Sequence, residues 1–212
     1  MLCQFTFKNY KSYRDETILD MQAVSSQGFE HSLLPDGNKQ ELLPVAAIYG
    51  PNAGGKSNVL DALKCLHSLV VFPILLFRGQ TNSQAVNCVP FLFDEKTPEE
   101  PTEFEIFFIP NAEFEYRYQI SVQKGKIVEE NLYRRKLAPN SRISTLFERS
   151  DGEIKLAQAT PYMKIIHIHR NNKNSICVFY SCQNIKTISY VVNQHRDDSD
   201  IFKCCSIDRP SR

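Results

Sequence analysis

Three of the chain's eight glycines fall within the stretch "GPNAGGKS" at residues 50–57. Gly50, followed after four residues by Gly55, Lys56 and Ser57, matches the Walker A pattern G-x-x-x-x-G-K-[ST]. In such a loop the glycines let backbone N–H groups curl around an anion, and the lysine ammonium meets the β- and γ-phosphates. The serine hydroxyl is a ligand for Mg²⁺. The spacing therefore predicts a phosphate-binding loop, with Ser57 as the Mg²⁺ ligand.

The flanking segments predict the strand and the helix that such a loop requires. Residues 42–50, "LLPVAAIYG", form an apolar run typical of a strand buried on both faces of a parallel sheet. Residues 56–72 have apolar residues at helical spacing, and Pro73 is expected to end that helix. The predicted core-facing positions are Val59, Leu60, Leu63, Leu66, Leu69 and Val70. The alternative, a glycine-rich turn that only joins a strand to a helix, matches this pattern by chance at a rate well under ~1%.

Composition limits the class of protein. With 212 residues, 42% of them hydrophobic and 23% charged, the chain can build one globular core. A net charge of +1 gives no overall attraction to nucleic acid or to a membrane. Lys8 and Lys11 interrupt any N-terminal signal peptide, and no apolar run reaches the ~20 residues that span a bilayer. Seven scattered cysteines fit reduced thiols, so we expect a cytoplasmic protein without a membrane partner.

The segments around the loop indicate a β-rich flank. Cys3, Phe5 and Phe7 alternate with polar residues, which predicts a half-buried strand. "FEIFFI" and "FEYRYQISV" flank "PNAE" as a hairpin, and "KGK" and "SDGE" are turns that continue an antiparallel meander. Ras-like or RecA-like domains would show further βα repeats. The predicted fold class is therefore α/β (α+β), a P-loop unit beside an antiparallel meander.

The loop and its surroundings resemble a known group of ATPases. "GPNAGGKSNVLDAL", with Asn58 directly after the serine, is similar to the P-loop of the RecF/SMC/OLD group of ABC-class ATPases. "FTFKNYKSYRDE" resembles their first strand. Segments up to residue 158 resemble the N-terminal lobe of bacterial AAA-family ATPases associated with abortive infection and phage defence. The resemblance covers residues 1–158 and implies the N-terminal lobe of an ATPase head that binds ATP and Mg²⁺.

The resemblance also implies a set of binding residues. Those in the loop are Gly50, Pro51, Asn52, Ala53, Gly54, Gly55, Lys56, Ser57 and Asn58. Lys11 and Ser12 would flank the adenine or the phosphates; an exposed lysine on a first strand is an equally open interpretation. No guanine-reading N-K-x-D motif follows the loop, which favours ATP. For the full-length family the resemblance implies a head-to-head homodimer as a candidate assembly, with DNA or an effector protein as a candidate further partner.

ATP hydrolysis requires further catalytic segments, and the sequence does not supply these segments clearly. "VPFLFDE" mimics a Walker B strand ending in Asp94 and Glu95, but Pro90 argues against a central strand, and the resemblance places a flank strand there. Gln80 and Gln84 are candidates for a Mg²⁺-sensing loop, although solvated glutamines are the simpler interpretation. We find no signature segment and no switch histidine, so the head is expected to be incomplete and its catalytic residues stay unassigned. Two functions remain open: an ATP-hydrolysing protein of DNA maintenance or phage defence, and a truncated nucleotide-binding fragment without turnover.

Residues 159–212 differ in composition from the rest. From residue 161 onward there are eight lysine and arginine residues against four aspartates and no glutamate, together with four of the seven cysteines. This segment is either a basic nucleic-acid-binding tail or a stretch read out of frame. We favour the second interpretation because the family resemblance ends at the same point.

Overall fold

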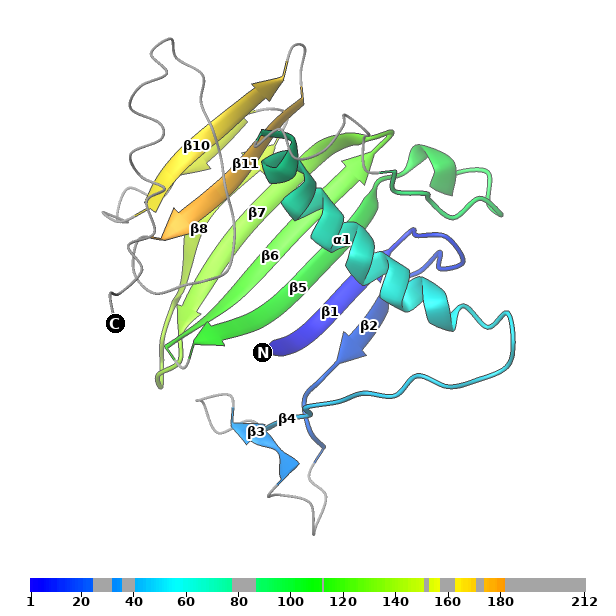
Figure 1. The fold of residues 1–212 in the computed structure, drawn as a ribbon, viewed down its shortest axis with the longest axis horizontal. Helices are drawn as coiled ribbons and strands as arrows, with labels where there is room; N and C mark the ends of the chain where they lie inside the picture. The colour runs from blue at the N-terminus through cyan, green and yellow to red at the C-terminus, as the bar shows by residue number, and fades with distance from the viewer. Residues whose placement is uncertain are drawn as a thin grey trace, which may run out of the picture.

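A seven-stranded sheet with one long helix packed across a face dominates the computed structural model (Figure 1). Every strand pair among the described residues is antiparallel, which confirms the predicted mixed α/β class with an antiparallel meander. The structure describes residues 1–24, 32–35, 41–77, 87–111, 113–150, 153–156, 163–170 and 174–181.

The strands of the large sheet run in the order β2-β1-β5-β6-β7-β8-β9. Their bounds are β1 (Leu2–Lys8), β2 (Thr17–Asp20), β5 (Thr102–Asn111), β6 (Phe114–Gln123), β7 (Lys126–Lys136), β8 (Ile143–Ser150) and β9 (Glu153–Leu156). Two small pairs lie outside it, β3 (Leu34–Pro35) with β4 (Glu41–Leu42), and β10 (Met163–Arg170) with β11 (Asn174–Ser181). A 3₁₀ helix covers Thr97–Glu99.

The meander from β5 to β9 is built from hairpins, and the sequence predicts the turn between β6 and β7. Between β6 and β7, Lys124 and Gly125 have φ values of 49° and 73°. Two successive positive φ values are the mark of a type I′ turn, whose twist matches that of the strands it joins. Gln123 therefore pairs directly with Lys126, and the predicted "KGK" turn is confirmed.

β1 lies inside the sheet, between β2 and β5, although β5 follows it by about a hundred residues. Cys3, Phe5 and Phe7 are all buried, as predicted, but Thr6 between them is buried as well. Phe5 and Phe7 belong to the core beneath α1, whereas Cys3 packs with Leu42 and Ile109. Phe5 stacks on Phe104 of β5 with ring centroids 6.4 Å apart. This aromatic surface is the floor on which the helix rests.

The helix α1 (Lys56–Phe77) crosses the face formed by β1, β5 and β6 (Figure 1). Its buried residues recur every three or four positions, and each fully buried large side chain contributes about 1.5–3 kcal/mol. They are Val59, Ala62, Cys65, Leu66 and Leu69. Leu63 and Val70 are partly buried against the same core, as predicted. Leu60 is 55% exposed, contrary to prediction, because steps of about 100° per residue place it opposite Leu69.

Pro73 does not end α1, which continues for four more residues to Phe77. A proline inside a helix removes one backbone hydrogen bond and typically kinks the axis. The hydrogen bonds on either side of that gap remain available, and the "ILLF" segment after Pro73 contains leucines, which are good helix formers. The expected stop was therefore wrong.

The predicted strand before the loop is also not formed. Residues 43–50 have no regular secondary structure, and their side chains are exposed, Tyr49 to 91%. The segment is tied at its start, where the Leu43 N–H donates to the Met21 carbonyl at 2.7 Å. A central parallel strand needs parallel neighbours, and every described strand pair is antiparallel. The apolar run indicated a segment that favours burial, but it did not indicate which strand could pair with that segment.

Some predicted features fall on residues that the structure does not describe. Gln80, Gln84 and most of residues 159–212 lie there. Within the tail the structure describes β10, whose hairpin with β11 lies against β7 (Figure 1). No helix in the described part of the chain is long and apolar enough to cross a membrane.

Candidate nucleotide-binding site

The glycine-rich loop leads directly into α1, whose first residue is Lys56. The Lys56 ammonium donates hydrogen bonds to the carbonyl oxygens of Gly50, at 2.9 Å, and Pro51, at 2.6 Å. It therefore lies across the loop rather than pointing into solvent. These two carbonyls carry no net charge, so they do not offset the positive charge of Lys56 beside the loop.

The loop backbone is folded tightly by short-range contacts. The Gly54 N–H donates to the Pro51 carbonyl at 3.2 Å, and the Asn58 N–H donates to the Gly55 carbonyl at 2.8 Å. Ala53 and Gly55 have φ values of 62° and 81°, in the left-handed region. Residues of alternating handedness turn consecutive N–H groups toward one side, which is the geometry of an anion-binding nest.

The start of α1 is electropositive. Its first turn holds no acidic residue, so nothing there offsets the positive end of the helix dipole or the charge of Lys56. The first N–H groups of any helix also lack acceptors within the helix. Ser57, the predicted Mg²⁺ ligand, is exposed on this first turn. The first-turn N–H groups, the Lys56 charge and the Ser57 hydroxyl therefore lie together at the N-terminal end of α1.

The turn that follows β1, residues 9–14, lies beside the loop. The Asn58 side-chain amide donates to the Ser12 hydroxyl oxygen at 2.8 Å, and the Tyr13 hydroxyl donates to the Gly55 carbonyl at 3.3 Å. The approach is close enough that a Cβ on Gly55 would lie 2.9 Å from the Ser12 oxygen. The structure therefore brings the predicted residue Ser12 to the loop.

Lys11, the other predicted residue from this turn, faces α1. Its ammonium forms an ion pair with Asp61 at 2.8 Å. The Tyr10 hydroxyl donates to the Asp61 backbone carbonyl at 3.3 Å. Lys11 is thus held by the second turn of the helix, where it neutralises a carboxylate close to the loop.

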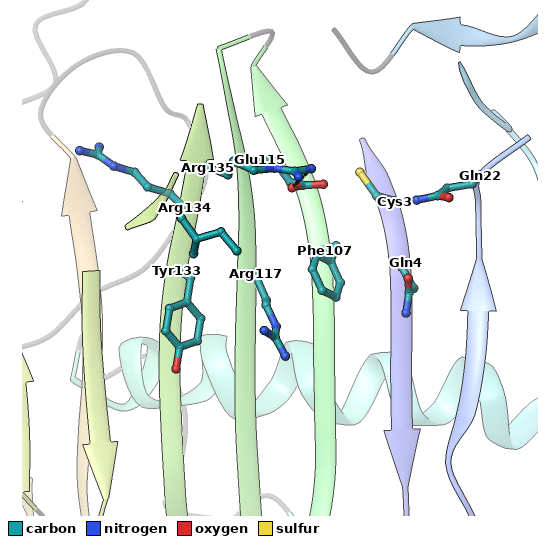
Figure 2. Close-up of a pocket in the computed structure, with 10 residues that line it drawn as sticks. Cys3, Gln4, Gln22, Phe107, Glu115, Arg117, Tyr133, Arg134 and Arg135 are labelled. Carbon is teal, nitrogen blue, oxygen red and sulfur yellow. Dashed lines mark ion pairs between the residues drawn. The ribbon is translucent and has the colours of Figure 1, made fainter. Parts of the chain in front are cut away.

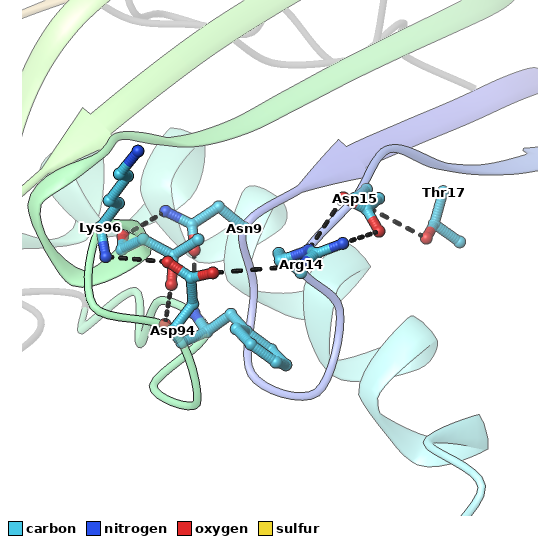
Figure 3. A network of polar contacts seen from close by, with 8 residues as sticks. Asn9, Arg14, Asp15, Thr17, Asp94 and Lys96 are labelled. Atoms are coloured by element: carbon cyan, nitrogen blue, oxygen red, sulfur yellow. Dashed lines mark hydrogen bonds and ion pairs between the residues drawn. The ribbon is translucent and has the colours of Figure 1, made fainter.

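Asn9 anchors the whole turn. It is fully buried at a φ of 53°, and its side-chain amide donates to the carbonyls of Thr97, Glu100 and Pro101 at 2.7, 3.1 and 3.2 Å. Its side-chain oxygen accepts the Phe91 N–H at 2.9 Å (Figure 3). No sequence pattern marked Tyr13 or Asp61 in advance. For Asn9, the available signal was the "NYKS" stretch at residues 9–12.

Asp94 lies in the same network and not at the end of a strand. Its carboxylate accepts the Lys96 N–H at 2.8 Å and lies 3.9 Å from Arg14 (Figure 3). The Lys96 hydrogen bond lowers the pKa of this carboxyl. Residues 87–93 form no strand, so "VPFLFDE" is neither a Walker B strand nor the expected flank strand. Asp94 stabilises a turn.

A separate pocket of about 260 Å³ opens on the face of the sheet that α1 does not cover (Figure 2). Arg117 crosses it, paired with Glu105 and stacked 5.5 Å from the Phe107 ring and 5.8 Å from the Tyr133 ring. At its rim Arg135 pairs with Glu115 at 2.7 Å. Carboxylates pair with these two arginines, whereas the third arginine of the lining, Arg134, lies 4.9 Å from the Phe114 ring.

A glycine-rich loop that leads into a helix opening with Lys-Ser places the chain in the P-loop class. Residues 45–158, more than half of the chain, match the family described as "AAA domain, putative AbiEii toxin, Type IV TA system". The chain belongs to this family of P-loop ATPases. A search of curated proteins found no match.

The residues at the loop fit ATP and Mg²⁺, the ligands that this family implies. An anion would meet the Lys56 ammonium and first-turn N–H groups that no carboxylate of that turn offsets. A divalent cation would meet the exposed Ser57 hydroxyl. The donor set therefore suits a triphosphate with its metal.

Proposed function

We propose that this chain binds ATP·Mg²⁺ through residues 50–58. Lys56 would hold the β- and γ-phosphates, the loop N–H groups would surround them, and Ser57 would ligate the metal. Ser12, which lies beside Gly55 and Asn58, would line the site. One observation supports this proposal most strongly. The Lys56 ammonium lies across the loop at the start of α1, and the first turn of that helix contains no carboxylate.

A titration with a fluorescent ATP analogue tests the proposal. Lys56→Ala removes a charge-assisted phosphate contact, so affinity should fall about tenfold or more. Lys155→Ala is the matched control, since Lys155 is exposed on β9, at the edge of the sheet far from β1 and the loop. Ser57→Ala should bind normally without Mg²⁺ and lose the gain that Mg²⁺ gives. Equal binding by wild type and Lys56→Ala would refute the proposal.

We further propose that the site prefers adenine over guanine. The family is one of ATPases, and the "NKNS" stretch at residues 172–175 lacks the aspartate that reads a guanine edge. A competition titration with unlabelled ATP and GTP measures this preference. Tighter binding of GTP would overturn it.

At the level of biology we propose a role in phage defence or DNA maintenance, as part of an ATPase head of the RecF/SMC/OLD type. The family description links such domains to abortive infection through type IV toxin–antitoxin systems. Heads of this type would pair through their nucleotide sites, with DNA or an effector protein as a further partner. Light scattering of the chain with and without ATP·Mg²⁺ tests the pairing. A mass that stays monomeric in both conditions contradicts it for this chain.

A further inference from the structure

Two cysteines from distant parts of the chain meet next to the turn 9–14. Cys65, in the third turn of α1, has its sulfur 2.8 Å from the sulfur of Cys88. Both are free thiols. Cys65 is buried and Cys88 is half-buried, so a small oxidant can approach from the side of Cys88. At this separation the sulfurs need to move together by less than 1 Å to reach the ~2.05 Å of a disulfide bond.

The surroundings make Cys65 the more reactive partner. The two thiols share a hydrogen bond in which either sulfur can be the donor. The hydrogen bond with Cys88 lowers the pKa of Cys65, the Tyr10 hydroxyl and the charge of Lys11 act in the same direction, and burial opposes them. The hydrogen bond with Cys65 and burial raise the pKa of Cys88. A thiolate is the form that attacks oxidants.

We propose that Cys65 and Cys88 are a redox modification site, which hydrogen peroxide converts into a reversible disulfide. The Cys65 thiolate attacks the peroxide, the O–O bond breaks, and Cys65 becomes a sulfenic acid while the released hydroxide takes up a proton as water. The Cys88 thiol then attacks the Cys65 sulfur, the S–O bond breaks, and the second hydroxide takes the thiol proton. Two thiols and one peroxide thus give one disulfide and two waters, and an added dithiol reverses the reaction.

The disulfide would clamp three parts of the fold together. The segment that carries Cys88 is bound to the turn 9–14, because the Lys11 N–H donates to the Val89 carbonyl at 2.9 Å and the Phe91 N–H donates to Asn9. That turn in turn contacts the glycine-rich loop through Ser12 and Tyr13. A covalent bond from Cys65 to Cys88 therefore fixes α1 to the segment that supports this turn. The reaction needs no nucleotide, so it stands or falls independently of ATP binding.

Peptide mapping of the full chain tests the inference directly. After brief treatment with hydrogen peroxide and alkylation of free thiols, a non-reducing tryptic digest should contain residues 65–78 linked to residues 79–96, and dithiothreitol should separate them. The melting temperature should rise by roughly 4 °C or more on oxidation and return on reduction. Cys88→Ser should abolish both effects, and Cys3→Ala, at a buried cysteine of β1, should leave both intact.

Two outcomes would overturn the inference. One is that both Cys65 and Cys88 remain alkylatable after peroxide has oxidised other thiols of the chain. The other is that peroxide carries Cys65 to the sulfinic acid, or links it to a different cysteine, without the 65–88 bond. Because the mapping is done on the wild-type chain, neither result depends on how well a variant folds.

Discussion

The Lys11 ammonium lies 2.8 Å from the Asp61 carboxylate, which joins the turn after β1 to the second turn of α1. Asp61 is the first acidic residue of α1. Lys11 therefore cancels the carboxylate that would most weaken the positive field at the helix start. This contact favours an indirect electrostatic role for Lys11, while the direct contact with adenine or phosphates that the family resemblance implies stays a prediction.

A pair of variants separates the two roles of Lys11. Lys11→Met should weaken ATP·Mg²⁺ binding about two- to fivefold, because the Asp61 charge is no longer cancelled near the phosphates. Lys11→Met combined with Asp61→Asn should restore most of the affinity. If the double variant binds as weakly as Lys11→Met, then Lys11 contacts the nucleotide directly. Isothermal titration calorimetry at low salt measures the three affinities.

The same ion pair predicts how Asp61 titrates. The hydrogen bond from Lys11 and its charge lower the pKa of the Asp61 carboxyl. Any stabilisation from the pair is therefore complete above the unfolded-state value of about 3.9 and is lost as the pH falls through the lower folded-state value. Carbon-detected NMR of the carboxyl should give a pKa below 3.9 in wild type, returning toward it in Lys11→Met. An unchanged titration in the variant contradicts the assignment of cause.

Gly55 and Gly125 offer a matched test of the close approach at the loop. Both have positive φ, 81° and 73°, so alanine imposes a similar backbone strain of about 1–2 kcal/mol at each. A Cβ at Gly55 would lie 2.9 Å from the Ser12 oxygen and 3.2 Å from the Tyr13 hydroxyl, whereas a Cβ at Gly125 meets nothing within 4 Å. Gly55→Ala should therefore cost more stability than Gly125→Ala and should alone impair nucleotide binding. Urea unfolding and the fluorescent titration measure the two effects.

A buried ion pair joins β7 and β8, two strands of the sheet that lie away from the loop. Glu130 of β7 and Arg149 of β8 are each 3% exposed and lie 3.2 Å apart, and the Tyr118 hydroxyl donates to Glu130 at 2.8 Å. Arg149→Met leaves a buried carboxylate and should lower the free energy of unfolding by about 3–5 kcal/mol. Replacing both residues, with Glu130→Leu and Arg149→Met, should recover much of that loss.

The control for that pair is the rim pair of Arg135 and Glu115, which is more exposed. Glu115→Gln should change the free energy of unfolding by less than about 1 kcal/mol, because exposed ion pairs contribute little. Urea denaturation of the four proteins gives the comparison. Equal losses at the two sites would show that burial does not set the strength of the Glu130–Arg149 pair.

The chain on its own should turn over ATP below about 1 s⁻¹, the low end of typical enzymes. Attack on the γ-phosphate needs an oriented water and stabilisation of developing charge, and the only Walker B mimic, Asp94, is committed to a turn. Phosphate release, with Lys56→Ala as the blank, measures turnover. A faster rate that disappears in both Lys56→Ala and Asp94→Ala would restore Asp94 as a catalytic residue.

The sequence predicted those parts of the fold that depend on local patterns. The alternation of Phe5 and Phe7 identified β1, and the turn at Lys124 and Gly125 identified the β6–β7 hairpin, because both patterns lie within a few residues. The apolar residues 43–49 gave a wrong strand, because an apolar run does not state which strand will pair with it. Likewise, helical spacing overestimated the burial of Leu60.

The candidate site likewise has one part that local sequence patterns predict and another part that they do not. The Walker A pattern placed Lys56 and Ser57 together because a short loop and one helix turn fix their geometry. The contacts Lys11–Asp61, Asn58–Ser12 and Cys65–Cys88 join residues separated by 50, 46 and 23 positions. No local periodicity encodes such pairs; they follow from β1 being placed between β2 and β5 and from the way α1 crosses it.

That placement of β1 has a consequence for how the chain acquires its structure. The hairpins from β5 to β8 join neighbours in sequence, so they can form early, whereas Gln4 meets its partner Phe107 only after about a hundred further residues exist. During synthesis, β1 can therefore pair only with β2 until α1 and then β5 have been made. The slow step of folding should be the closing of this long loop, and its rate should depend on the Phe5–Phe104 contact more than on any contact within the meander.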